Sequence, residues 1–206
     1  MDGLSIRRRI ALDIARSMRK SQEEEHPLRQ LFWECTLRCN LRCQHCGSDC
    51  KQVAATPDMP KEDFFKVLDS IAAKTDPHKV FVIISGGEPT MRADLEECGK
   101  GIYSRGFPWG MVTNGFGMTA ERFSRLLGAG LHSMTVSLDG LEENHDWLRG
   151  REGSFTRAAE TIRMAVRSGI AFDVVTCVNR RNYSQLPQLK EFLIGLGLKE
   201  WRLFSI

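Results

Sequence analysis

Short apolar runs alternate with amphipathic stretches along most of this chain, and this alternation restricts the fold more than any other feature. The run from Val80 to Ser85 is almost continuously apolar, which is typical of a strand buried on both faces of a parallel sheet. Strands joined by helical crossovers predict an α/β fold built on one sheet. The predicted strands cover 31–36, 80–85, 109–113, 133–138, 172–178 and 199–206, and the predicted helices between them cover 61–74, 92–105, 119–129, 154–168 and 186–196.

Length and composition favour one domain and exclude several classes of protein. A chain of 206 residues with 42% hydrophobic residues can bury one substantial core. A net charge of +3 is too small to indicate a nucleic-acid partner. The longest apolar runs are strand-sized and far shorter than a bilayer span. Because the start has no long apolar run, the seven cysteines indicate a reducing cytoplasm rather than a secreted disulfide scaffold.

Three cysteines at short spacing, Cys39, Cys43 and Cys46, form the pattern CxxxCxxC, which occurs once in the chain. Thiolates at such spacing favour zinc or an iron–sulfur cluster over hard cations. A structural zinc site usually takes four ligands as two separated pairs, and the second pair is missing because Cys98 and Cys177 stand alone. A cubane cluster held by three cysteines leaves one iron open to another ligand.

The other cysteines have a more ordinary interpretation. Cys35 lies on a predicted strand and Cys50 follows the cysteine-rich segment, so either is a possible spare ligand. A small buried thiol is the commoner fate of an extra cysteine, and we leave both out of the predicted site. Cys177, on the strand predicted over 172–178, is expected in the core.

The strand that ends at Ser85 leads directly into the sequence GGEP. Gly86 and Gly87 allow the backbone to approach a ligand closely, Glu88 offers a carboxylate, and Pro89 stiffens the exit. A Gly-Gly step after a strand often marks no more than a turn. Its position about forty residues after the cysteine triplet gives it more weight.

Together, CxxxCxxC, GGEP, TNG at 113–115 and SLDG at 137–140 resemble the radical S-adenosylmethionine (SAM) superfamily. The family's hallmark is CxxxCxΦC with Φ usually aromatic, and His45 stands at that position here. The resemblance implies a 4Fe–4S cluster on the three cysteines, with SAM bound to the open iron. Reductive cleavage of SAM would then give a 5′-deoxyadenosyl radical.

The resemblance also implies roles for residues outside the triplet. The GGEP segment, Gly86 to Pro89, would hold the ammonium group of SAM, and Ser137 and Asp139 would meet its polar parts, including the ribose. Asn179 resembles a family position that lines the adenosine pocket. Arg149, in a predicted loop, is a candidate partner for a carboxylate of SAM or substrate, with an ordinary surface arginine as the alternative.

The fold implied by the resemblance is the partial (β/α)6, TIM-like barrel of the radical SAM core, over residues 30–206. Residues 1–29 form a separate predicted region, a basic amphipathic helix over 4–19 followed by a polar linker. We favour a helix that caps the barrel over one that contacts an anionic membrane. Related proteins often carry a C-terminal SPASM or twitch extension, whose cysteines are missing here, so truncation after the sixth strand is expected.

The predicted function is that of a radical SAM enzyme which abstracts hydrogen, with peptide or protein maturation as the leading substrate class. Tetrapyrrole chemistry, as in haem-forming relatives, is the second possibility. A non-catalytic iron–sulfur or zinc module remains an alternative from another class. The expected partners are a peptide or small-molecule substrate and an electron donor such as flavodoxin or ferredoxin, without nucleic acid.

Overall fold

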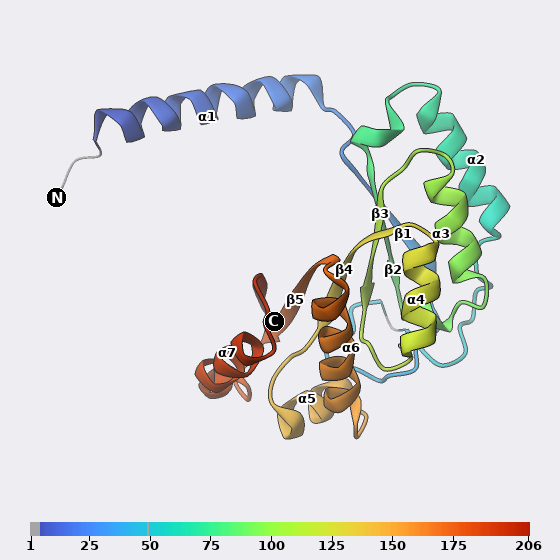
Figure 1. Ribbon diagram of the computed structural model, residues 1–206, viewed down its shortest axis with the longest axis vertical. Helices are drawn as coiled ribbons and strands as arrows, with labels where there is room; N and C mark the ends of the chain where they lie inside the picture. Colours follow the sequence, from blue (N-terminus) through green and yellow to red (C-terminus); the bar gives the residue numbers. More distant parts are fainter. Residues whose placement is uncertain (1–4, 49) are drawn as a thin grey trace.

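The computed structural model describes residues 5–48 and 50–206, except for the side chains of 22–25. Six strands form one sheet in the order of the sequence, and every neighbouring pair is parallel. The sheet is open, with β1 and β6 at its edges, so the predicted α/β partial barrel is confirmed (Figure 1). The strands are β1 (Gln30–Thr36), β2 (Phe81–Gly86), β3 (Trp109–Thr113), β4 (Leu131–Ser137), β5 (Ala171–Val178) and β6 (Trp201–Ser205).

The helices lie between the strands as predicted, with one addition. The new helix is α5, in a segment that the sequence analysis treats as a loop. The helices after the first strand are α2 (Lys61–Ala72), α3 (Leu95–Tyr103), α4 (Ala120–Gly128), α5 (Glu142–Arg149), α6 (Ser154–Ser168) and α7 (Leu186–Gly195), with short 3-10 turns η1 (Pro77–Lys79), η2 (Pro89–Met91) and η3 (Tyr183–Gln185).

Helix α5 escapes detection by hydrophobic periodicity because its buried face is largely polar. Asn144, His145 and Arg149 are buried together with Leu148, whereas Trp147 is exposed. An amphipathic pattern requires apolar residues on the inner face, and this eight-residue helix has one.

The core lies between the sheet and the helices that cover one of its faces, among them α2, α3, α4 and α6 (Figure 1). On β2, Val82 and Ile84 are fully buried toward the helices. Phe81 and Ile83 point the other way and are only partly buried, because they line an open cavity of about 330 Å³ on the inner face of the sheet. The expectation that this strand is buried on both faces is therefore wrong for the inner face.

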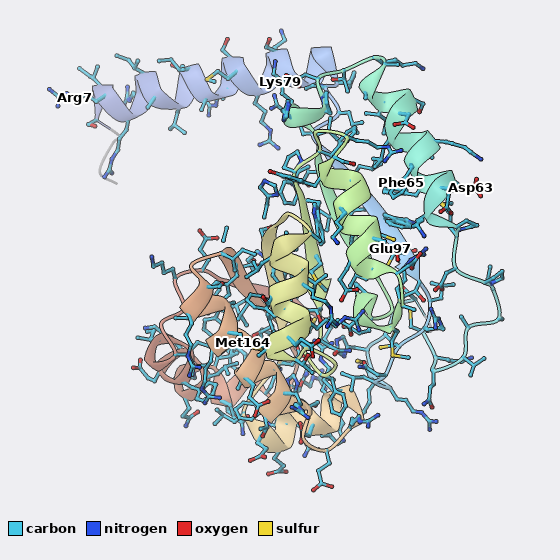
Figure 2. All side chains as sticks on the ribbon, turned by 45° about the vertical axis from the view of Figure 1, so that its right-hand side comes forward. Arg7, Asp63, Phe65, Lys79, Glu97 and Met164 are labelled. Carbon is cyan, nitrogen blue, oxygen red and sulfur yellow. The ribbon has the colours of Figure 1, made fainter. Side chains whose placement is uncertain are left out.

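Helix α1 (Ile6–Glu25) extends away from the sheet, with labelled Arg7 near its distant end (Figures 1 and 2). Ile6, Ile10 and Ile14 are 55–77% exposed, so the predicted capping of the barrel is wrong for the described residues. Arg7 interrupts the apolar stripe of this helix, which leaves little continuous apolar surface to bury. The predicted start at Leu4 lies outside the described residues. Among described helices, α1 included, none combines the length and the apolar character needed to span a membrane.

Candidate functional site

Loops that follow neighbouring strands meet around one cavity of about 180 Å³ at the carboxyl ends of the strands. The cysteine triplet follows β1, the Gly-Gly step follows β2, and Asn114 follows β3. The structure therefore brings these motifs together, as expected for parallel strands. The described residues that line the cavity are Cys39, Cys43, Cys46, Cys50, Ser85, Gly86, Gly87, Val112, Thr113, Asn114, Ser137 and Arg149.

Four predicted site residues lie outside this lining. Glu88, Pro89 and Asp139 are buried behind it. Asn179 is half-buried after β5, and its side-chain oxygen accepts hydrogen bonds from the backbone N–H groups of Arg181 and Asn182, at 2.9 and 3.1 Å. This oxygen is therefore committed to the turn that follows β5.

The cysteine loop, residues 37–51, is closed into a ring by its own backbone. The N–H of Cys39 donates to the carbonyl of Lys51 at 2.8 Å, and the N–H of Lys51 donates to the carbonyl of Leu37 at 3.3 Å. These bonds bring the end of the loop back to its beginning. They also place Cys50 close to Cys39, although ten residues separate the two cysteines in the sequence.

The Gly-Gly step packs directly against the start of the cysteine loop. The N–H of Gly87 donates to the carbonyl of Thr36 at 2.8 Å, and the N–H of Glu88 donates to that of Arg38 at 2.9 Å. A Cβ atom on either Gly86 or Gly87 would lie 2.3 Å from one of these carbonyl oxygens, and Gly86 has a φ of +121°. The close approach that the glycines permit is therefore to the backbone of the cysteine loop as well as to the cavity.

Helix α5 holds the other side of the cysteine loop. The N–H of Arg42 donates to the carbonyl of Arg149 at 3.1 Å, and that of Gln44 donates to Leu148 at 2.9 Å. Gly150 ends the helix in the left-handed conformation, and a Cβ there would lie 2.4 Å from the carbonyl oxygen of Arg42. The unpredicted helix thus provides backbone acceptors that fix the loop on both sides of Cys43.

Glu88 joins the loops after β2 and β3. Its Oε1 accepts hydrogen bonds from the hydroxyls of Thr90 and Thr113, at 2.8 and 2.7 Å, and from the N–H of Thr90 at 3.2 Å. Its Oε2 accepts from the N–H of Asn114 at 2.8 Å. Burial raises the pKa of Glu88, and these donors oppose the rise. Both carboxylate oxygens of Glu88 are therefore already hydrogen-bonded to residues of the loops that it joins.

Asp139 and Arg149 form a buried ion pair beside the cavity, with 2.6 Å between Oδ2 and Nε. Asp139 Oδ1 also accepts a hydrogen bond from the N–H of Cys177 at 2.8 Å. Arg149 is 8% exposed, so its interpretation as a surface arginine is wrong. It lies at the end of α5 and donates from Nη1 to the sulfur of Cys43 at 3.6 Å.

The sulfur atoms of Cys39 and Cys43 accept hydrogen bonds from neighbouring N–H groups. Besides Arg149 on Cys43, the sulfur of Cys39 accepts from the N–H of Leu41 at 3.5 Å and from Nδ2 of Asn114 at 3.9 Å. Donors of this kind stabilise thiolates bound to iron. Burial raises the pKa of the thiols of Cys39 and Cys43, and Arg149 opposes this rise at Cys43. Metal binding to these thiols would displace their protons.

A second group of potential ligands lies next to the cavity. The ligand atoms of His45, Asp139 and Cys177 lie within 4.8 Å of one another. The guanidinium of Arg149 already neutralises Asp139, which disfavours a further cation there. Cys177 is only half-buried, so its predicted place in the core is wrong, whereas Cys35 is 1% exposed and confirms the expected buried thiol.

Five lining residues are absent from the predicted site: Cys50, Ser85, Val112, Thr113 and Asn114. Asn114, the central residue of TNG, donates to the side-chain oxygen of Asn40 at 2.8 Å as well as to Cys39. Its position directly after a predicted strand was the sequence feature that could have indicated a place in the site. Cys50 lines the cavity with the triplet, contrary to the expectation of a buried thiol apart from the site. Nothing in its sequence position indicated the ring closure that brings it there.

Comparisons with known proteins agree with this geometry. The family model for the radical SAM superfamily matches residues 33–193. Fe-coproporphyrin III synthase of Methanosarcina barkeri is 32% identical over 163 residues, which cover 79% of this chain and 40% of the relative. PqqA peptide cyclase of Methylocella silvestris is 28% identical over 170 residues, which cover 82% of this chain and 45% of the relative.

A solved structure shows the same fold. Streptococcus suis SuiB bound to precursor peptide SuiA superposes with a TM-score of 0.73 at 18% identity, covering 99% of this chain and 46% of SuiB. SuiB has also been solved with S-adenosylmethionine. The chain spans about half the length of the curated relatives it matches. The solved structure agrees in fold, and the match of the family model over residues 33–193 shows that the chain belongs to the radical SAM superfamily, whose members use a 4Fe–4S cluster and SAM.

Proposed function

We propose that this chain forms the catalytic core of a radical SAM enzyme that abstracts a hydrogen atom from its substrate. The observation that carries the proposal is the single cavity shared by the three cysteines, the Gly-Gly step and Ser137. Cys39, Cys43 and Cys46 would hold the cluster and leave one iron for SAM. When bound, the two cofactors supply a 5′-deoxyadenosyl radical after one-electron reduction.

The spacing of the triplet supports a cluster over a zinc ion. Tetrahedral Zn–S bonds of about 2.3 Å would bring the sulfurs to about 3.8 Å from one another. Among the described side chains, the three-ligand group found within 4.8 Å is His45, Asp139 and Cys177, so the triplet is spaced more widely. Thiols that share a cavity but do not converge on one point suit a multi-iron cluster.

The residues around the triplet would bind and position rather than react. Glu88 already accepts four hydrogen bonds, so we assign it to positioning of the GGEP and TNG loops; a contact with the SAM ammonium would then come from backbone carbonyls of the same loop. Arg149 would hold the sulfur of Cys43 and orient α5 against the cysteine loop. Ser137, which is 8% exposed in the lining, remains the proposed contact to a polar group of SAM.

For the substrate, we propose a peptide or protein that is matured by the reaction. The name of PqqA peptide cyclase and the precursor peptide bound to SuiB support this class. A tetrapyrrole is the second candidate, favoured by the 32% identity to Fe-coproporphyrin III synthase. An electron donor such as flavodoxin or ferredoxin would complete the reaction in the cell.

Transfer of deuterium would distinguish these classes. The anaerobically loaded, dithionite-reduced protein would be given SAM with either a deuterated candidate peptide or a tetrapyrrole deuterated on its propionate side chains. Deuterium in 5′-deoxyadenosine would show abstraction from that substrate. A loaded protein that forms no 5′-deoxyadenosine under any condition would contradict the proposal.

A further inference from the structure

The cavity that the cysteine triplet lines carries a fourth thiol, that of Cys50. The backbone fixes its position, because Lys51 pairs with Leu37 and Cys39 through the two hydrogen bonds that close the cysteine loop. Cys50 is half-buried; its thiol makes a weak contact to the carbonyl of Ser48 at 3.8 Å and is hydrogen-bonded with the thiol of Cys46. The thiol therefore lies at the cavity in direct contact with one member of the triplet.

The other thiols of the chain are not placed in this way. Cys35 and Cys98 are 1% and 0% exposed in the core on the helical side of the sheet. Cys177 lies beside Asp139 and does not line the cavity. Among the described cysteines, Cys50 is thus the one that shares a cavity with the triplet.

Three cysteine ligands leave one iron of a 4Fe–4S cluster without a protein ligand, and a nearby thiolate is a strong ligand for iron. When neither SAM nor a protein ligand is bound, water or another small ligand would occupy that iron, and the iron could be lost from the cluster. The spacing of the four cysteines, CxxxCxxCxxxC, provides ligands for all four irons within one short loop.

We propose that Cys50 ligates the fourth iron while SAM is absent and gives way to the amino and carboxylate groups of SAM when it binds. The inference rests on the proposed function, because it requires the cluster on the triplet. Cys50 releases its proton on binding iron and takes one up when it is displaced, and no electron is transferred. Cys50 is then a protective ligand whose release is coupled to SAM binding.

The test compares the wild-type protein with Cys50→Ala, with Cys98→Ala as a control that removes a thiol outside the cavity. Each protein is loaded anaerobically with isotopically enriched iron and measured by Mössbauer spectroscopy without and with SAM. We expect four equivalent thiolate-ligated irons in the wild type and in Cys98→Ala, and one distinct iron after SAM is added. Cys50→Ala should show the distinct iron before SAM is added.

Two further readouts follow from the same ligand exchange. Mild ferricyanide oxidation should convert Cys50→Ala to a three-iron cluster, detected by electron paramagnetic resonance, while the wild type keeps four irons. If Cys50 leaves about 10% of the wild-type clusters open, its removal should tighten SAM binding about tenfold. Circular dichroism would check that Cys50→Ala remains folded.

A distinct iron in the wild type without SAM, equal to that in Cys50→Ala, would overturn the inference. So would four equivalent irons in the wild type after SAM saturation, because Cys50 would then be a permanent ligand. If the wild type forms a cluster and cleaves SAM but Cys50→Ala behaves identically, the role of Cys50 fails alone. A protein that takes up no cluster would overturn both this inference and the proposed function.

Discussion

Two buried carboxylates, Glu88 after β2 and Asp139 after β4, brace the site in different ways. Both are 0% exposed. Glu88 is held by neutral donors from Thr90, Thr113 and Asn114. Asp139 is held by the charged guanidinium of Arg149 and by one backbone N–H.

This difference separates two tasks. The neutral donors around Glu88 belong to the turn η2 and to the end of β3 with the loop that follows it, so this carboxylate fixes backbone positions. The ion pair of Asp139 reaches the triplet, because Arg149 also donates to the sulfur of Cys43. We infer that the Glu88 side sets the shape of the cavity and that the Asp139 side sets the charge beside a cluster ligand.

The largest effect on stability is expected for Asp139→Asn. This change leaves the buried guanidinium of Arg149 without a counter-charge, which should lower the free energy of unfolding by about 3–5 kcal/mol. Denaturant unfolding would measure it. The control is Glu143→Gln in the exposed pair with Arg181, with an expected loss of about 1 kcal/mol or less. Equal losses in the two variants would show that the buried pair is no more important than a surface pair.

A smaller loss is expected for Glu88→Gln. The new amide group must point one N–H donor toward the donors of Thr113 or Asn114, which leaves a buried group unpaired and should cost about 1–3 kcal/mol. Glu97→Gln, on the exposed surface of α3 (Figure 2), is the matched control and should change the stability little. If the Glu88→Gln protein were as stable as this control, the hydrogen bonds of Glu88 would not be what holds the two loops together.

The Asp139 side should also respond to pH through His145, whose Nδ1 accepts a hydrogen bond from the N–H of Asp139 at 3.0 Å. Burial, followed by the charge of Arg149, lowers the pKa of His145 to about 4. The unfolded chain therefore binds the proton first as pH falls below 6.5, and stability is lost from there down to about 4.

Between about pH 7 and about pH 5, this group should remove about 2 kcal/mol from the free energy of unfolding. His145→Asn keeps an acceptor but cannot titrate, so its stability should fall by correspondingly less over the same range. Chemical unfolding at the two pH values would compare them. Parallel pH profiles for the two proteins would mean that His145 titrates alike in the folded and unfolded states.

The smallest effect is expected in α1, far from Glu88 and Asp139. Ile10 is 55% exposed, so Ile10→Asp should change the free energy of unfolding by less than about 0.5 kcal/mol. Thermal or denaturant unfolding would detect a larger loss. A loss comparable to that of Glu88→Gln would show that α1 packs against the rest of the chain in solution.

The sequence predicted the fold well because its strongest signals are periodic. The apolar run that contains Val82 and Ile84 corresponds to a strand of the core, and Thr119 caps α4 as expected by accepting from the N–H of Arg122. The three cysteines and the Gly-Gly step were found because their spacing is local. The position of α1 was not predictable, since an amphipathic stripe does not specify what covers it.

The missing parts of the site depend on contacts between distant segments. Helix α5 buries polar residues, so hydrophobic periodicity could not reveal it, and with it the surroundings of Arg149 were missed. The place of Cys50 depends on two backbone hydrogen bonds of Lys51, which carry no signal in the side chains. The hydrogen-bonded role of Glu88 required the segments after β2 and β3 to be placed in space.

Cleavage of SAM tests the central claim most directly. The anaerobically reconstituted and dithionite-reduced protein should contain about four irons per chain and convert SAM to 5′-deoxyadenosine. Cys43→Ala should form none, and Cys98→Ala, in the core, should retain the reaction. Stoichiometric zinc with no 5′-deoxyadenosine from the wild-type protein would contradict the account.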